Sequence, residues 1–287
     1  MLEDILKQYS RSEIVQICKY LNRDYNIYDP DELGWKKIKY AFDKTPDAMW
    51  VSLRSQMSYN EFVNHLILNY YACERVIKYY FIDFLKNAMH DIVAFEMSIG
   101  DSRIDICRIN GKLCAYEIKT EYDNYDRLAS QMSDYVRAFE KVYVVVPMQN
   151  VSIIKAHIPP ESGIIAYRIR DDKKIVFSYQ KKASNNSCDI HFCINSLSSN
   201  DLVKLIKMLN VTSLSTKDCN LKLIEDIIRQ KNIWPTYKRF LKNKYYDQWE
   251  YLKNHFSNIL PIDCQSFFST QMNPDILYEK GNGHMAF

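Results

Sequence analysis

Two carboxylates and an ammonium group stand out in the stretch 103–119, which otherwise has the apolar pattern of two short β-strands. They belong to Asp105, Glu117 and Lys119. The dipeptide Asn110-Gly111 between the two halves predicts a hairpin, because both residues tolerate positive φ at low steric cost. A purely structural hairpin has little use for such charges, so their distribution over its two faces decides what they can do.

The length of the loop determines which side chains share a face of this hairpin. With a two-residue loop, Asp105 falls opposite Tyr116, and Glu117 falls opposite Ile104. The two carboxylates would then lie on opposite faces of the sheet.

A three-residue loop, 109–111, with its glycine in the left-handed position of a bulge, gives a second register. Arg108 then pairs with Lys112, and Arg103 pairs with Glu117. The sequence favours this register, because a one-residue slip would bury a carboxylate. One face carries residues that can pack into a core (Ile104, Ile106, Cys114, Tyr116 and Ile118), and the other carries Asp105, Glu117 and Lys119.

Carboxylates that converge on one side of a rigid sheet offer the hard oxygen ligands that Mg²⁺ prefers, and Mn²⁺ accepts the same ligands. A nearby lysine can hold a water molecule or a developing negative charge. We therefore expect Asp105 and Glu117 to bind Mg²⁺ or Mn²⁺ beside Lys119.

The same residues carry a family resemblance. Asp105 followed by Glu117-Ile118-Lys119 resembles the Asp…Glu-x-Lys signature of the PD-(D/E)XK nuclease superfamily. The order of elements over roughly residues 59–147 is similar to a small, poorly characterised bacterial branch of that superfamily. The associations of this family suggest a biological setting such as phage defence.

The resemblance implies an α/β fold: a restriction-endonuclease-like α/β/α core with a mixed sheet, flanked by helical N- and C-terminal regions. It implies that Asp105, Glu117 and the Ile118 carbonyl hold the metal. Lys119 would orient or help deprotonate the attacking water.

In that superfamily the first core helix often supplies a further acid to the metal. A long helical pattern runs over 59–90, and Glu74 at the edge of its apolar stripe is the candidate. The alternative is a boundary carboxylate that pairs with Lys78. Glu96, in a strand expected over 91–99, ranks lower because it alternates in facing with its apolar neighbours.

A helix expected to end near residue 140 carries a polar row beside its buried stripe. The row contains Arg127, Gln131 and Tyr135. Such a row usually faces solvent, whereas the resemblance implies that Gln131 and Tyr135 border the site and position substrate. The buried stripe is expected to contain Leu128, Met132, Val136 and Phe139.

The segment 229–244 holds six basic residues and no acidic ones, interleaved with aromatic residues. Lys238 and Arg239 would neutralise phosphates while the aromatic rings stack on bases. The alternative is an amphipathic helix whose aromatic residues belong to the core. Arg103, on the charged face of the hairpin, either contacts a phosphate or pairs with Glu117.

Length and composition set broad limits. A chain of 287 residues can bury a sizeable core, and its formal charge of +3 is too small to argue for nucleic acid by itself. Eight cysteines without a Cys-x-x-Cys pair, no N-terminal signal and no long apolar run predict a reduced, cytoplasmic protein with no membrane segment. Structural zinc is not expected.

The patterns predict three regions: a helical N-terminal region (1–58), a nuclease-like core (59–195) and a helical C-terminal region (196–287). The helical ends are expected to offer surfaces for a homodimer or a protein partner. Helices are expected from Ser10 or Ser12 onward and over 31–42, and strands over 142–146, 164–169 and 174–179.

The sequence thus predicts a metal-dependent nuclease that hydrolyses phosphodiester bonds. DNA is the expected substrate by analogy with the superfamily, and RNA is the alternative. Two other classes stay open: a catalytically silent nucleic-acid-binding or regulatory protein on the same fold, and a structural interaction protein that works through its helical ends.

Overall fold

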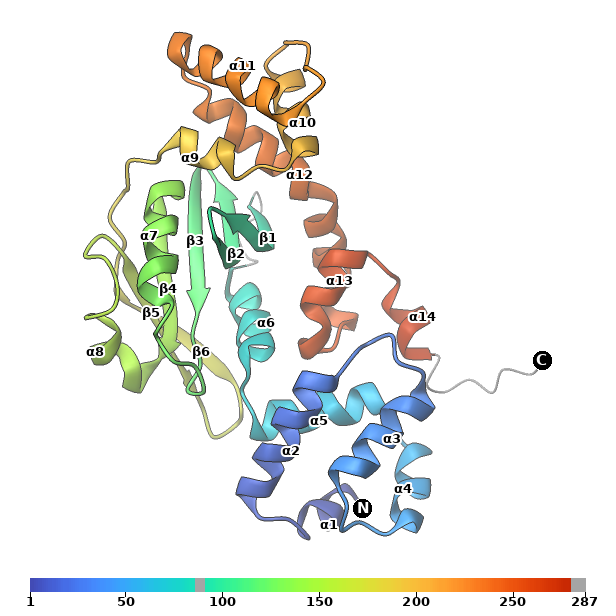
Figure 1. Ribbon diagram of the computed structural model, residues 1–287. Coiled ribbons are helices and arrows are strands. Elements are labelled where there is room, and N and C mark those ends of the chain that lie inside the picture. The colour runs from blue at the N-terminus through green and yellow to red at the C-terminus, as the bar shows by residue number, and fades with distance from the viewer. Residues whose placement is uncertain (86–90, 280–287) are drawn as a thin grey trace, which may run out of the picture. The chain divides into compact units, whose positions relative to one another are not determined.

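The computed structural model describes residues 1–85 and 91–279 (Figure 1). The chain forms two compact units, one of Met1–Tyr80 with Tyr251–Phe287 and one of Phe81–Glu250. The division into three regions expected from the sequence stays a prediction.

The second unit contains a mixed β-sheet with helices, which confirms the α/β fold with helical flanks. Its strands are β1 (Ile92–Ile99), β2 (Ser102–Asn110), β3 (Lys112–Ile118), β4 (Lys141–Pro147), β5 (Gly163–Ile169) and β6 (Ile175–Lys181). Its helices are α7 (Leu128–Ala138), the 3-10 helix η1 (Met148–Asn150), α8 (Val151–Ile154), α9 (Ile190–Asn195), α10 (Ser199–Met208), α11 (Lys217–Gln230) and most of α12 (Trp234–His255).

The six strands lie in sequence order across the sheet. Antiparallel hairpins join β1 to β2 and β2 to β3, whereas β3, β4 and β5 run parallel and β6 is antiparallel again. The strands expected over 91–99, 142–146, 164–169 and 174–179 are all present. Residues Val142 to Val146 of β4 are buried, as expected for a central strand covered on both faces.

Helices cover both faces of this sheet. On one face, α7 packs along the strands, and its Tyr135 hydroxyl lies within hydrogen-bonding distance of β2 and β3 (Figure 1). On the other face, Phe81 from the second half of α6 (Glu74–Leu85) packs edge-on against Tyr116 and Phe177. The distances between ring centroids are 5.0 Å and 5.1 Å, respectively. The charged face of the hairpin therefore lies under α7.

All eight cysteines are free thiols. Within residues 1–85 and 91–279, no helix has both the length and the apolar character that crossing a bilayer requires.

The first unit is helical in its described part. Its elements are α1 (Leu2–Leu6), α2 (Arg11–Asp24), α3 (Asp31–Ala41), α4 (Asp47–Arg54), α5 (Tyr59–Tyr70), the start of α6, the end of α12, the 3-10 helices η2 (Phe256–Asn258) and η3 (Pro261–Asp263), α13 (Cys264–Thr270) and α14 (Pro274–Glu279). Its core includes Trp35, Phe42, Trp50 and Phe62, whose rings pack at tilted or edge-on angles.

Two predicted helix positions in this unit are confirmed. The amide of Glu13 donates to the Ser10 hydroxyl and the Glu13 carboxylate accepts from the Ser10 amide, so α2 begins with a capping box. The helix expected over 31–42 is α3.

The prediction of a single helix over 59–90 is wrong. The chain leaves helical geometry at Tyr71, where φ is −145°, and a new helix starts at Glu74. Apolar residues keep the helical spacing across this break, so periodicity alone could not reveal it. The last part of the expected helix, 86–90, lies outside the described residues.

A buried carboxylate joins distant parts of the first unit. The hydroxyls of Tyr25 and Tyr278 each donate to Oδ2 of Asp263 at 3.0 Å. Among the described residues, the buried Oδ1 atom has no hydrogen-bond partner. Burial raises the pKa of Asp263 to about 7, against the opposing effect of the two tyrosine hydroxyls.

This raised pKa predicts how the stability of the first unit depends on pH. Between about pH 4 and pH 7 the unfolded chain releases the Asp263 proton while the folded chain keeps it, so the free energy of unfolding falls as pH rises. The loss can reach about 4 kcal/mol. In calorimetry, Asp263→Asn should remove most of the drop in melting temperature between pH 5 and pH 8. Asp43→Asn, at an exposed position of the same unit, should retain it, and an equal drop in wild type and Asp263→Asn would contradict the prediction.

Candidate functional site

The hairpin between β2 and β3 turns at Gly111, whose φ is +61°. Ile109 is 1% exposed and stays paired within the strand ladder, so the turn begins after this residue and not with it. The predicted pairing of Arg108 with Lys112 is therefore wrong, and Arg108 pairs with Cys114. With Ile109 buried inside the ladder, the observed register differs by two residues from the predicted one.

A shift of two residues preserves the predicted faces, because side chains alternate with a period of two. The ladder between β2 and β3 ends at the pair Ile106 and Tyr116, so the next position on each strand is Asp105 and Glu117. The two carboxylates thus lie directly opposite each other on one face. The predicted sharing of a face is confirmed, and the predicted pairing of Glu117 with Arg103 is not.

Asp105 is buried, and at the end of the ladder its side-chain carboxylate takes the place of a backbone hydrogen-bond acceptor. Its Oδ2 accepts a hydrogen bond of 2.7 Å from the amide of Ile118. The bond fixes the Asp105 carboxylate between the two strands. The Ile118 carbonyl stays a predicted ligand.

Glu117 is 2% exposed, and both of its carboxylate oxygens have partners. Oε1 accepts from the Lys119 ammonium at 2.8 Å, and Oε2 lies 3.0 Å from the Tyr135 hydroxyl. Burial and the neighbouring Asp105 raise the pKa of Glu117 to about 7, although Lys119 and Tyr135 act in the opposite direction. Without a cation, keeping Glu117 negatively charged beside Asp105 in this buried position costs free energy.

Lys119 connects the hairpin with α7. Its ammonium also donates to Oε1 of Gln131 at 3.2 Å. Burial opposes the charge on Lys119, but the carboxylates of Glu117 and Asp105 outweigh it and raise the lysine pKa, so the ammonium form persists.

Tyr135 is fully buried, so the alternative of a polar row that faces solvent does not hold for this residue. Its hydroxyl lies 2.9 Å from the backbone carbonyl of Arg103 as well as near Glu117. Burial, followed by the charge of Glu117, raises the pKa of Tyr135, so this hydroxyl remains a donor. Gln131 and Tyr135 therefore both contact the charged cluster, as the sequence analysis expected.

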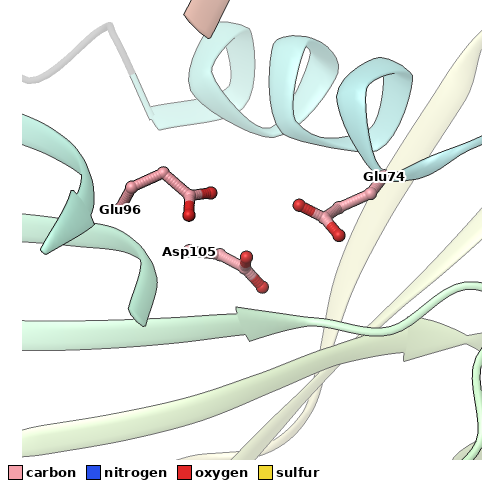
Figure 2. A group of neighbouring side chains, drawn as sticks. All are labelled: Glu74, Glu96 and Asp105. Carbon is pink, nitrogen blue, oxygen red and sulfur yellow. The ribbon is translucent and has the colours of Figure 1, made fainter. Parts of the chain in front are cut away.

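Glu96 joins this face from β1. Phe95 pairs with Ile106 and Met97 pairs with Ile104, which puts Glu96 opposite Asp105. One carboxylate oxygen from each of the two side chains lies within 4.8 Å of the other. Figure 2 shows both side chains extending into the same region beside the strands.

The backbone of Glu96 has a φ of +53°, in the left-handed region that non-glycine residues enter rarely and at an energetic cost. Its carboxylate also pairs with the Arg103 guanidinium at 2.5 Å. The ranking of Glu96 below Glu74 as a ligand stays a prediction, whereas its position opposite Asp105 is a finding that the sequence interpretation lacked. The two-residue turn at Gly100-Asp101 was the available signal, since it pairs Ile99 with Ser102 and so aligns Glu96 with Asp105.

Glu74 belongs to the first unit and is the first residue of α6 (Figure 2). Its carboxylate lies 2.6 Å from the Lys78 ammonium, and its side chain is 48% exposed. The pairing is the alternative that the sequence allowed. A role for Glu74 as a metal ligand stays a prediction.

The predicted phosphate-binding arginines are exposed. Arg103 pairs with Glu96 and not with Glu117, and Arg127 is the N-cap residue of α7. Both guanidinium groups remain candidates for substrate contact.

The basic segment belongs to the end of α11 and to α12. Tyr237 and Phe240 are each 2% exposed, so these aromatic residues belong to the core. Lys238 donates to the carbonyl of Gly111 at 2.6 Å and lies 3.3 Å from Glu140, which ties α12 to the hairpin. Arg239 is exposed. Contact of these cations with nucleic acid stays a prediction.

Comparison with known proteins gives one family. A profile described as "Bacteriophage P4 protein cII" matches residues 69–266, which is more than half of the chain. No solved structure matches.

One curated relative is Protein cII of Enterobacteria phage P4, which is 30% identical over 66 residues. The aligned segment spans 23% of this chain and 25% of the phage protein, so the chain covers about a quarter of that relative. The match of the family profile over 69–266 is the broader finding, and by it the chain belongs to the bacteriophage P4 protein cII family.

Proposed function

We propose that this chain is a metal-dependent nuclease that hydrolyses phosphodiester bonds, with DNA as its main substrate. The observation that carries the proposal is the direct apposition of Asp105 and Glu117 on neighbouring strands, with the Lys119 ammonium bound to Glu117. The order α6, β1, β2, β3, α7, β4 is also the one that the PD-(D/E)XK resemblance implies. A cytoplasmic location and a role in phage or mobile-element biology belong to the same proposal.

The residues present fit a hard divalent cation. The donors on this face are carboxylate oxygens. The fold holds them close together in a buried position although their charges repel. Asp105, Glu117, Glu96 and the Ile118 carbonyl would hold Mg²⁺ or Mn²⁺, and Glu74 stays a further candidate. When bound, such an ion supplies Lewis-acid polarisation of the phosphate and a more acidic water.

The side chains around the carboxylates have defined tasks in this proposal. Tyr135 fixes one oxygen of Glu117, and Gln131 helps to hold the Lys119 ammonium in place. Lys119 orients the attacking water and stabilises the negative charge that develops on the phosphate. Arg103 and Arg127 offer exposed cations for flanking phosphates, and the exposed Arg239 adds one from α12. Lys238 is half-buried beside Glu140 and stays a further candidate.

One observation favours a second candidate function. Both oxygens of Glu117 already have partners within the chain, so the cluster is partly satisfied without any ion. A catalytically silent protein that binds nucleic acid or regulates through this fold would have the same arrangement. Cleavage and binding must therefore be measured separately.

The first test is cleavage of single-stranded DNA, double-stranded DNA and RNA in Mg²⁺ or Mn²⁺. Asp105→Ala and Lys119→Ala should each lower the cleavage rate by roughly a hundredfold or more, because they remove a metal ligand and a positioned charge. Lys112→Ala, in the same hairpin but exposed at its tip, should cleave like wild type. Substrate binding without cleavage that survives both substitutions would support the second candidate and sink the first.

Metal binding can be measured without any activity. Saturating Mn²⁺ at 100 times its dissociation constant should stabilise the wild-type chain by about 2.7 kcal/mol and raise its melting temperature. Glu117→Gln should lose this increase, because it removes a charged ligand. Glu121→Gln, at an exposed position shortly after β3, should retain it, and an unchanged increase in Glu117→Gln would exclude Glu117 as a ligand.

The backbone of Glu96 gives a third test. Glu96→Gly should raise the free energy of unfolding by about 1 kcal/mol, because glycine adopts positive φ without the clash of a Cβ atom. The same change should weaken Mn²⁺ binding. Denaturant titration and Mn²⁺ titration measure the two effects, with Glu96→Ala as the control that loses the carboxylate and keeps the strain. A stability gain with full Mn²⁺ affinity would remove Glu96 from the site.

A further inference from the structure

The second unit contains a cavity of about 250 Å³ beside the edge strand β1. This volume is below the range of roughly 300–1,000 Å³ that is typical of pockets for drug-sized ligands, so the cavity takes a single ring system and no larger group. Its walls come from β1, from the segment that joins α9 to α10, and from α12. The lining includes Glu96, Met97, Ser198, Asp201, Lys244 and Tyr245.

The cavity adjoins the candidate metal site through one residue. Glu96 lines the cavity, and one of its carboxylate oxygens lies within 4.8 Å of an oxygen of Asp105. A group bound in the cavity would therefore lie about one side chain away from the catalytic carboxylates.

The charged side chains of the lining are paired with one another or with a neighbour, which disfavours a phosphate as the occupant. Lys244 is the one cation among the lining residues, and its ammonium already pairs with Asp201 at 2.8 Å. The second carboxylate, that of Glu96, pairs with the Arg103 guanidinium at 2.5 Å. A phosphate would therefore find no unpaired cation among the lining residues, whereas N–H donors on a neutral ligand can bind to the carboxylate oxygens.

The other walls suit a flat aromatic ring. Tyr245 is one of the lining residues, and the Lys244 ammonium lies 5.2 Å from the centroid of its ring. The backbone of Met97 to Ile99 belongs to an edge strand. Aromatic side chains stack on unpaired bases, and carboxylate and carbonyl oxygens accept from exocyclic amino groups.

We infer that this cavity receives one unpaired nucleobase that carries an exocyclic amino group, from a nucleotide next to the scissile phosphate. The inference rests on the proposed nuclease function, which it extends from phosphodiesters in general to single-stranded or locally opened nucleic acid. Asp201 accepts from the amino group, Tyr245 supplies the stacking surface, and Glu96 joins this recognition to the metal site.

Base insertion is tested without relying on cleavage. An oligothymidylate with a single 2-aminopurine is titrated with the full chain in EDTA, and its fluorescence reports on stacking of that base. Wild type should change the fluorescence on binding. Leu241→Trp, which fills the cavity from α12, should remove the change, and Asp201→Asn should weaken binding of this oligonucleotide about tenfold relative to oligothymidylate alone.

Asp247→Asn is the matched control, since Asp247 is exposed on α12 and does not line the cavity. It should behave like wild type, and circular dichroism establishes that each variant is folded. With Mg²⁺, cleavage of oligothymidylates that carry one adenine or cytosine should occur at a fixed distance from that base in wild type, and without positional preference in Asp201→Asn. Cleavage without any fluorescence change or base preference would overturn the inference and leave the nuclease intact. A fluorescence change without cleavage would retain the base cavity and reject the nuclease.

Discussion

The repulsion between Asp105 and Glu117 across one position of the sheet is the constraint on which the candidate site depends. Both carboxylates are buried, and burial raises the pKa of Glu117. Burying like charges costs folding free energy. The surrounding contacts offset part of that cost, because Lys119, Tyr135 and the Ile118 amide all donate to the pair. A cluster held together in this way would be stabilised further by a cation and destabilised by any slip of the hairpin.

Glu96 is a second place where an energetic cost coincides with the candidate site, and here the cost lies in the backbone. An extended residue at this position would continue the ladder to β2, and the left-handed φ of Glu96 interrupts it. The interruption leaves its carboxylate beside Asp105 and within reach of Arg103. Strained residues of this kind persist when the surrounding structure over-determines them, and they cluster at functional sites. In this unit the flanking pairs of Phe95 and Met97 supply that restraint.

The sequence was sufficient for features that follow from periodicity, and insufficient for those that depend on a single burial or dihedral angle. Alternation gave the strands and the shared face of Asp105 and Glu117, since a shift by two residues does not alter facing. It missed the register because the burial of Ile109 is a tertiary effect. It also missed the position of Glu96 opposite Asp105, because facing within one strand does not say which residue of the neighbouring strand lies across from it. The break after α5 left no trace in the apolar spacing, so one helix was expected where the chain forms two.

Glu96 would also make the proposed metal site and the neighbouring cavity dependent on each other. It contributes a negative charge to the cavity wall and a carboxylate beside Asp105. A cation bound by these carboxylates would reduce the negative charge felt in the cavity, and a base that draws on Glu96 would compete with the cation for it. By thermodynamic linkage each ligand would alter the affinity for the other by the same factor. One shared carboxylate would therefore tie the choice of base to the occupancy of the proposed metal site, which two independent pockets could not do.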